Sequence, residues 1–367
     1  MAEKVHMLEY IYENPRALQD TLAQNQKAIE GLIHTCSQRN VKRIILTGLG
    51  SSYTAAKMAE PLFQMLLPLP VFVFHSDDIR QIAKVLVDEK TLVVVISRSG
   101  ERGSVIEAVE LSEQKGAIVA AVTGVADSML AKVAKMSLLT AEGPEITFPK
   151  TKSVMACACV LMQLGLEFAT RSGKDVLELR TELNRIPDKL AGSIGYLDSA
   201  VSVIINQIKD CSAISVAGSM SNYGVALESA VKIQESSNRF TRGDSLAGLL
   251  HGPLGAVNDD WAVLLLVTRN DAALNEDILR TANKLHARTI SVIPEKMEVA
   301  VRPEFPIQLP FSTEDLLAGL LYLPVVQLFA YHWAMALGMN PDAPAAMMDI
   351  LKAILPEGRE EPELRKE

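Results

Sequence analysis

Hydroxyl side chains follow a short glycine turn early in the chain and could bind a phosphate. Gly48-Leu49-Gly50 ends the apolar run 41–46, and residues 51–54 (Ser-Ser-Tyr-Thr) open a segment with helical periodicity. A helix N-terminus carries about half a positive charge and several unpaired N–H donors, and glycine and serine let an anion come close to them. An ordinary serine N-cap is the alternative interpretation.

A second serine-rich turn strengthens the case for an anion site. The apolar residues 92–96 run into Ser97-Arg98-Ser99-Gly100-Glu101, and a helical pattern begins near Gly103. Two strands of one parallel sheet would then end in polar turns at the same carboxyl edge, where open α/β sheets bind their ligands. Together the two turns predict a phosphate site.

Acidic and basic side chains in the second half of the chain could move protons. Glu228, Lys232 and Glu235 are spaced by four and three residues, which places them on one face of a helix. His251 follows in the segment 248–253 (GLLHGP). Carboxylate and imidazole are common general acids and bases, but a solvated ion-pair stripe and a structural histidine are the alternatives.

Alternating strands and helices must position these groups. Residues 1–40 are expected to form two helices, the second over 15–38, and residues 41–170 alternate strand and helix as in a doubly wound parallel sheet. The residues expected in strands are 43–46, 71–74, 92–96 and 117–122. Residues 175–210 read as a helical connector that Pro187 and Gly192 break.

The first half of the chain is repeated in the second. Tyr223 follows Tyr53 by 170 positions. Residues 263–269 match 92–98, and 289–294 match 118–123, both at an offset of 171. This near-constant offset predicts a duplicated domain. Asn270-Asp271 replaces the Ser99-Gly100 pair, so we expect the second copy to lack the phosphate cradle.

Composition excludes several classes of protein. The 367 residues carry a net charge of −8 with 36 basic residues scattered along the chain, which argues against nucleic acid as a partner. Four cysteines without metal-ligand spacing indicate reduced, buried thiols, and no apolar signal segment opens the chain. Residues 316–338 could span a bilayer, but Pro324, Gln327 and His332 interrupt them and favour a buried helix.

These motifs resemble the SIS (sugar isomerase) domain family. The resemblance covers nearly the whole chain and is strongest to the isomerase half of glucosamine-6-phosphate synthase and to related bacterial phosphosugar isomerases and deglycases. It rests on the segments 12–15 (YENP), 50–53 (GSSY), 97–101 (SRSGE), 226–236 (ALESAVKIQES) and 249–253 (LLHGP).

The resemblance implies an α/β fold with two doubly wound, flavodoxin-like SIS domains in tandem. The expected divisions are N-terminal helices over 1–40, a phosphate-binding domain over 41–172, a helical connector over 173–212, a second domain over 213–338, and a C-terminal loop and tail over 339–367.

The resemblance also assigns roles to residues. Glu235 falls on the family's catalytic glutamate, with Lys232 beside it, and His251 falls on a ring-opening histidine that the neighbouring subunit supplies. Residues implied in substrate phosphate binding are Gly50, Ser51, Ser52, Ser97, Arg98, Ser99 and Arg102, and other substrate neighbours are Lys150 and Thr151.

Three positions depart from the synthase pattern. Arg98 stands where a glutamine is usual and Arg102 where a threonine is usual, so either guanidinium could pair with a substrate carboxylate or with Glu101 or Glu107. Asp349 stands where the synthase has a lysine that forms an imine with the open-chain ketose, although Lys352 lies three residues later.

The sequence thus predicts an enzyme that acts on an amino-substituted hexose 6-phosphate. An isomerase or deglycase using Glu235 and His251 is the first hypothesis; an aminosugar-phosphate deaminase-isomerase without a glutaminase half and a non-catalytic sugar-phosphate sensor are the alternatives. We expect a cytoplasmic homodimer with a shared active site, a sugar 6-phosphate as substrate, no cofactor, no metal, and neither nucleic acid nor membrane as a partner.

Overall fold

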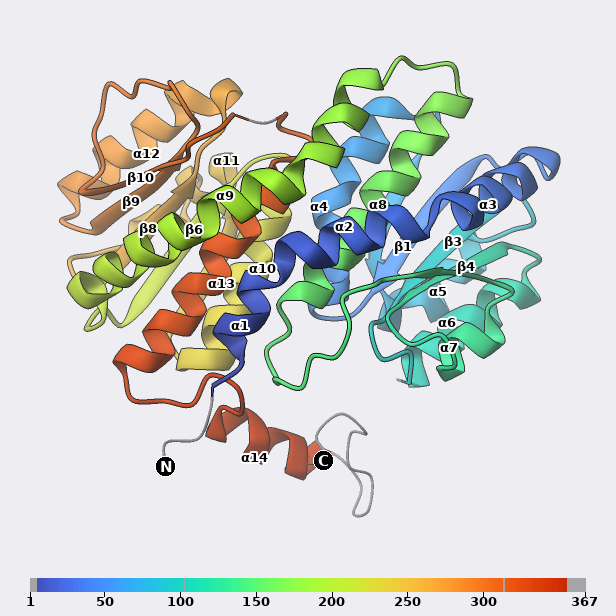
Figure 1. The fold of residues 1–367 in the computed structure, drawn as a ribbon, viewed down its shortest axis with the longest axis horizontal. Coiled ribbons are helices and arrows are strands. Elements are labelled where there is room, and N and C mark those ends of the chain that lie inside the picture. The colour runs from blue at the N-terminus through green and yellow to red at the C-terminus, as the bar shows by residue number, and fades with distance from the viewer. Residues whose placement is uncertain (1–4, 102, 313, 355–367) are drawn as a thin grey trace. The chain divides into compact units, whose positions relative to one another are not determined.

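The computed structural model describes residues 5–101, 103–312 and 314–354. Its two halves each contain a five-stranded parallel sheet flanked by helices (Figure 1). The α/β class with two doubly wound parallel sheets in tandem, expected from the sequence, is therefore confirmed.

The first sheet has the strand order β2-β1-β3-β4-β5, which is the flavodoxin-like order. Alternate residues of its central strands, such as Val93 and Val95, pack against α5–α7, and α4 packs against β1 and β2. With both faces covered, every residue of β3 and β4 is buried. The strands are β1 (Arg43–Gly48), β2 (Val71–His75), β3 (Thr91–Ile96), β4 (Ile118–Thr123) and β5 (Met136–Leu139), and the helices are α4 (Ser51–Leu66), α5 (Ile79–Leu86), α6 (Gly103–Gln114) and α7 (Met129–Val133).

The second sheet repeats this order as β7-β6-β8-β9-β10. Each of its strands begins 169 or 170 residues after its counterpart, as Ala213 does after Arg43 and Phe240 after Val71. The duplicated architecture is thus confirmed, with the offset of 171 corrected by one or two residues. The strands are β6 (Ala213–Gly218), β7 (Phe240–Ser245), β8 (Trp261–Leu266), β9 (Arg288–Ile293) and β10 (Phe305–Gln308), and the helices are α10 (Ser221–Ser237), α11 (Leu246–Leu250), α12 (Ala272–Lys284), α13 (Ala318–Ala336) and α14 (Ala345–Ile354).

Among the described residues before β1, there are three helices rather than two: α1 (Met7–Tyr12), α2 (Asn14–Gln24) and α3 (Gln26–Gln38). The break between α2 and α3 falls at Asn25, whose buried side chain donates to Leu139 O at 2.8 Å and accepts from Leu139 N at 3.0 Å. Asn25 thus satisfies backbone groups of β5, and this long-range pairing is not visible in the helical periodicity of residues 15–38.

The connector is one unbroken helix, α9 (Leu177–Ile208), so the expectation that Pro187 and Gly192 break it was wrong. Proline inside a helix costs about 3 kcal/mol. Apolar residues along one side of α9 are buried, among them Leu190, Leu197 and Val201. Burial of each such side chain contributes about 1.5–3 kcal/mol, so packing outweighs the proline.

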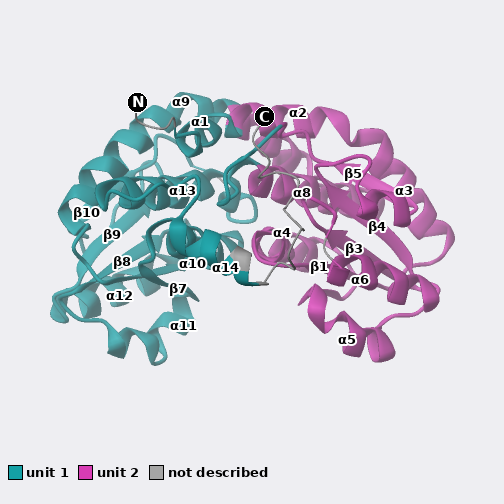
Figure 2. Cartoon of the chain, turned by 90° about the horizontal axis from the view of Figure 1, so that it is seen from below, with its two compact units in different colours: residues 1–14, 144–152, 188–367 teal, residues 15–143, 153–187 magenta. Residues whose placement is uncertain are grey.

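The chain forms two compact units (Figure 2). Unit 1 contains residues 1–14, 144–152 and 188–367, and unit 2 contains residues 15–143 and 153–187. The short segment 144–152 therefore belongs with the second sheet, although it directly follows the first sheet in the sequence. Helix α8 (Lys152–Arg171) begins at its end.

Two apolar helices are buried inside the protein. The apolar segment 316–338 forms α13, most of whose residues are buried, including Pro324 and Gln327, which confirms a buried helix. Among the described residues, only α8 is long and apolar enough to cross a membrane, and 83% of its apolar window is buried, as in a core helix. All four cysteines are buried and lie outside disulfide bonds, and burial raises the pKa of Cys36 and Cys159 to about 12.

Candidate active site

The two serine-rich turns leave neighbouring strands of the first sheet. β1 and β3 pair in parallel, and their last residues, Gly48 and Ile96, are register partners. A Cβ on Gly48 would lie 2.8 Å from Ser52 Cβ and 3.0 Å from Ile96 O, so only glycine lets α4 start this close to the strand end. The turn itself requires the positive φ of +51° at Gly50.

The serine hydroxyls in these turns do not cap α4. The N-cap of that helix is Gly50, which has no side chain, so the interpretation of an ordinary serine N-cap is wrong here. Ser97 is buried, and its Oγ accepts from Gly100 N at 3.2 Å. Within the described part of the chain, no hydrogen bond engages the hydroxyl of Ser52 or of Ser99.

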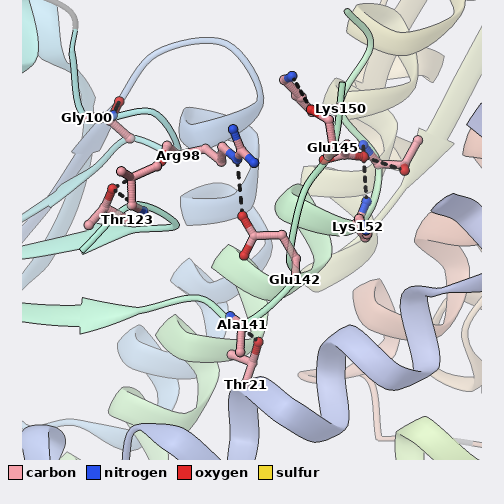
Figure 3. Close-up of polar contacts among 12 residues, drawn as sticks. Thr21, Arg98, Gly100, Thr123, Ala141, Glu142, Glu145, Lys150 and Lys152 are labelled. Carbon is pink, nitrogen blue, oxygen red and sulfur yellow. Dashed lines mark hydrogen bonds and ion pairs between the residues drawn. The ribbon is translucent and has the colours of Figure 1, made fainter. Parts of the chain in front are cut away.

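Arg98 is held by a carboxylate that the sequence did not single out. Figure 3 shows its Nε facing the carboxylate of Glu142. The Nε donates to Glu142 Oε1 at 3.2 Å, and the two side chains are 16% and 1% exposed. A Cβ on Gly124 would lie 2.3 Å from Glu142 Oε1, so this glycine leaves room for the carboxylate. The other Glu142 oxygen, Oε2, is buried without a partner among the described residues.

The acidic partners considered for Arg98 have other partners. Glu107 pairs with Arg80 at 2.5 Å, and Glu101 Oε1 accepts from Met129 N at 3.0 Å. Arg102 itself lies outside the described residues. Glu142 opens the segment EGPE (142–145), three residues after the end of β5.

Replacing Ser99 with alanine is expected to weaken phosphate binding about ten- to a hundred-fold. The change would remove a hydrogen bond to a charged group, which contributes about 1.5–3 kcal/mol. Titration calorimetry with a hexose 6-phosphate measures this loss. The matched control is Ser199→Ala, on the exposed surface of α9, which should bind as the unmutated protein does. Equal affinity of the unmutated protein for the unphosphorylated sugar would contradict the phosphate site.

The Glu228, Lys232 and Glu235 cluster on α10 is buried rather than solvated. Lys232 Nζ lies 2.5 Å from Glu235 Oε2 and 3.7 Å from Glu228 Oε1. The side chains of Lys232 and Glu228 are 1% and 0% exposed, whereas that of Glu235 is 20% exposed. The alternative of a surface ion-pair stripe is therefore wrong, because a stripe of that kind keeps its charges in water.

The positive charge of Lys232 lies close to the negative charges of Glu228 and Glu235. Burial lowers the pKa of Lys232, but the nearby carboxylates, Glu235 first and Glu228 second, outweigh burial and raise that pKa above its usual value. Lys232 therefore stays protonated. Its ammonium holds the Glu235 carboxylate in place. Because Glu235 is partly exposed, its carboxylate can contact a ligand.

Lys150 and Thr151 hold their own segment in place. Lys150 Nζ donates to the backbone oxygens of Glu145 and Thr147 at 3.0 and 2.9 Å. Thr151 donates from both N and Oγ1 to Glu145 Oε1, at 2.6 and 2.7 Å. Gln327 of α13 donates to Thr151 O at 3.0 Å. These contacts fix the segment 144–152 within unit 1, and Glu145 is the residue that the sequence did not reveal.

His251 and the C-terminal residues Asp349 and Lys352 belong to elements other than α10, the helix that carries Glu235. His251 is exposed just after α11, and no hydrogen bond or ion pair joins it to Glu235 within the described residues. Asp349 is exposed on α14. Lys352 lies on the same helix, and its side chain is outside the described residues. Within one chain, the structure thus brings Glu235 together with Lys232 but not with His251.

The second sheet keeps the turn of the first but fills it differently. Met220 starts α10 with φ +49° and ψ −127°, nearly the values of Gly50 at the start of α4, +51° and −127°. In this half, Ser219 follows β6, and Thr268 and Asp271 follow β8. The carboxylate of Asp271 accepts from Thr268 Oγ1 at 2.6 Å and from Ser219 Oγ. An anion from the chain itself thus occupies hydroxyl donors of these turns, which supports the expectation that this half lacks a phosphate cradle.

Comparisons with known proteins find relatives that are named for reactions of sugar phosphates. The SIS domain model matches residues 39–166. The chain is 31% identical over 354 residues to the glutamine–fructose-6-phosphate aminotransferase [isomerizing] of Thermococcus kodakarensis, a match that covers 94% of this chain and 58% of that protein. The corresponding Pyrococcus horikoshii protein is 31% identical over 342 residues, which is 92% of this chain and 56% of that protein. The chain thus spans little more than half the length of these relatives.

Solved structures share the fold. The C-terminal domain of glucosamine-fructose-6-phosphate aminotransferase from Francisella tularensis superposes with a TM-score of 0.84 at 22% identity, covering 94% of this chain and 99% of that one. The tagatose-6-phosphate ketose/aldose isomerase from Escherichia coli gives a TM-score of 0.79 at 22% identity and 96% coverage of both. By its match to the family model, the segment 39–166 is a SIS domain, and the second parallel sheet of the chain repeats the strand order of the first.

Proposed function

We propose that the protein is a phosphosugar enzyme of the isomerase and deglycase type, acting on a ketose 6-phosphate that carries an amine on C1. The observation that carries the proposal is the buried Lys232 between Glu228 and Glu235, with only Glu235 partly open to solvent. A carboxylate held in this way is suited to act as a general base.

The reaction needs one proton transfer and one water. Glu235 removes a proton from C1 of the amino-ketose, giving a C1–C2 enolamine, and returns a proton at C2. The resulting imine at C1 is hydrolysed by water to hexose 6-phosphate and free amine. Opening the sugar ring requires a further acid-base group, which is the role we assign to His251, supplied by a second copy of the chain because it is exposed and not paired with Glu235.

Substrate recognition in this proposal divides between phosphate and amine component. Ser52, Ser97 and Ser99 would donate to the phosphate, with the backbone N–H groups of the same turns. Arg98, oriented by Glu142, carries a guanidinium suited to a carboxylate on the amine component. The proposed set of substrate-binding residues is completed by Gly50 and Ser51 in the first turn and by Lys150 and Thr151 in the segment 144–152.

The C-terminal residues favour deglycation over imine-based isomerisation. Asp349, at the position where the synthase-like pattern has a lysine, cannot form an imine with a ketose. A substrate that already carries its amine does not need that lysine. Proton transfer by Glu235 is then sufficient, with hydrolysis by water.

A substrate comparison tests this function. Purified protein is incubated with a fructosamine 6-phosphate derived from an amino acid, with one derived from a simple alkylamine, and with fructose 6-phosphate plus ammonia. We expect release of amine and hexose 6-phosphate from the first substrate. Release from the second should be slower, because that substrate has no carboxylate for Arg98 to bind. Turnover of fructose 6-phosphate plus ammonia alone would indicate a deaminase-isomerase. Binding without any turnover would indicate a sensor.

A further inference from the structure

The arginine of the serine-rich turn after β3 is fixed at both its main chain and its side chain. Arg98 O accepts from Thr123 Oγ1 at 3.1 Å and from Gly124 N at 3.0 Å, at the end of β4. Arg98 Nε donates to Glu142 Oε1 at 3.2 Å, in the segment after β5. All of these residues belong to unit 2. The turn is therefore joined to the ends of two neighbouring strands, and of these three partners it is Glu142 that holds the guanidinium.

The pair formed by Arg98 and Glu142 costs free energy in its buried site. The Glu142 side chain is 1% exposed, and its Oε2 has no hydrogen-bond partner among the described residues. Removing two charges from water and leaving a buried oxygen unpaired both oppose folding, so two apolar side chains of similar volume would stabilise this site as well or better. Gly124 leaves room for the carboxylate, because a Cβ there would lie 2.3 Å from Glu142 Oε1. The chain thus accommodates the pair at a cost, which favours a role in ligand binding over a role in stability.

A guanidinium beside the proposed phosphate ligands can bind a second anion. Arg98 stands between Ser97 and Ser99, and its planar group carries five N–H donors. Glu142 engages the donor on Nε, and the Arg98 side chain is still 16% exposed. A long side chain loses rotamer freedom when it binds an anion, and a partner that has already ordered it removes this loss from the binding step. Glu142 supplies that order before any ligand binds.

We propose that Glu142 is the positioning residue that gives the site its preference for a substrate with a carboxylate on the amine component. Glu142 holds the Arg98 guanidinium in the orientation that receives this carboxylate and does not itself contact the substrate. The inference rests on the proposed function for the substrate, whereas the coupling between Glu142 and Arg98 does not.

Removing the Glu142 charge has two effects of opposite sign on carboxylate binding. The guanidinium loses its order, which weakens binding of the carboxylate. The site also loses a negative charge, which strengthens binding of any anion. If Glu142 positions Arg98, the first effect is the larger one. If Glu142 only screens Arg98, the second effect dominates, so the direction of the change distinguishes the two roles.

Glu142→Gln tests the proposal through the affinities of two compounds. Titration calorimetry compares the fructosamine 6-phosphate derived from an amino acid with the one derived from an alkylamine. We expect the unmutated protein to prefer the first by about ten- to a hundred-fold, the contribution of a hydrogen bond to a charged group, and Glu142→Gln to lower this preference about tenfold. A preference that stays the same or rises in Glu142→Gln would overturn this inference alone. Equal affinities in the unmutated protein, or binding of neither compound, would overturn the carboxylate role of Arg98 in the proposed function and this inference with it.

Gly124→Ala displaces the same carboxylate without changing a charge. The added Cβ would lie 2.3 Å from Glu142 Oε1 and 3.1 Å from Thr140 Oγ1, so Glu142 must move. We expect the preference for the carboxylate compound to fall as it does in Glu142→Gln. Gly31→Ala in α3 is the matched control, because an added Cβ there meets open space, and it should keep the full preference. A Gly124→Ala variant with the full preference would contradict the positioning role.

An apolar replacement of the pair tests the coupling without any sugar phosphate. Urea unfolding compares Arg98→Met, Glu142→Leu and the variant with both changes, with Glu142→Gln as the substitute where Glu142→Leu does not fold. Each single change leaves one charge of the pair without its partner and should lower the urea midpoint, whereas the double change should restore the midpoint or raise it. Additive losses would overturn the coupling. The double variant should also lack the preference for the carboxylate compound, and a retained preference would overturn the role of the pair in recognition.

Discussion

Glu235→Gln is expected to lower kcat for amine release by roughly 10²- to 10⁴-fold, the usual contribution of a general base. Glutamine cannot take the C1 proton, yet it has the size of glutamate and leaves Lys232 beside the carboxylate of Glu228, 3.7 Å away. Substrate affinity should change far less than kcat. The measurement is steady-state release of amine from the amino-acid-derived fructosamine 6-phosphate.

Two further experiments test whether the effect of Glu235→Gln is specific. Glu110→Gln, an exposed glutamate of α6, is the matched control and should keep full activity. Mixing Glu235→Gln with an inactive His251→Ala variant should restore part of the activity if a second copy supplies the histidine. A Glu235→Gln variant that retains the normal rate on every substrate that the unmutated protein turns over would remove Glu235 from the mechanism.

Lys232→Met should destabilise the fold by about 3–5 kcal/mol, because it removes one partner of a buried ion pair. Glu228 is 0% exposed and would be left without its cation. Urea unfolding followed by circular dichroism measures the loss. Adding Glu228→Gln to Lys232→Met should recover part of it, since the uncompensated charge is then gone. A double variant less stable than Lys232→Met would contradict this account.

The loss of stability caused by Lys232→Met should not change between pH 7 and pH 9. The folded-state pKa of Lys232 is raised above its unfolded value of about 10.4, so its contribution to stability is present in full below that value. It is lost only as the pH rises through the folded-state pKa. The destabilisation caused by Lys232→Met should therefore be the same at pH 7 and pH 9, both of which lie below the unfolded pKa.

Local patterns in the sequence predicted the elements that carry the site. The apolar runs over 92–96 and 117–122 predicted strands buried on both faces, since only such strands dispense with polar alternation. Glycine followed by serine predicted the turns, because backbone close approach and positive φ are local requirements. The break at Asn25 was missed, because it depends on a hydrogen bond between residues 114 positions apart. The four-residue strand β5, which pairs with β4, was also missed.

The sequence by itself determined the doubled α/β fold, the two turns and the spacing that sets Glu228, Lys232 and Glu235 on one helix face. Helical periodicity and strand hydrophobicity are properties of neighbouring residues, so one chain read alone displays them. Only the tertiary structure decided that Lys232 is buried, that Arg98 pairs with Glu142 rather than with Glu101 or Glu107, and that Glu145 caps α8. Burial and ion pairing depend on which distant segments share a low-dielectric environment, and the folded chain alone sets that.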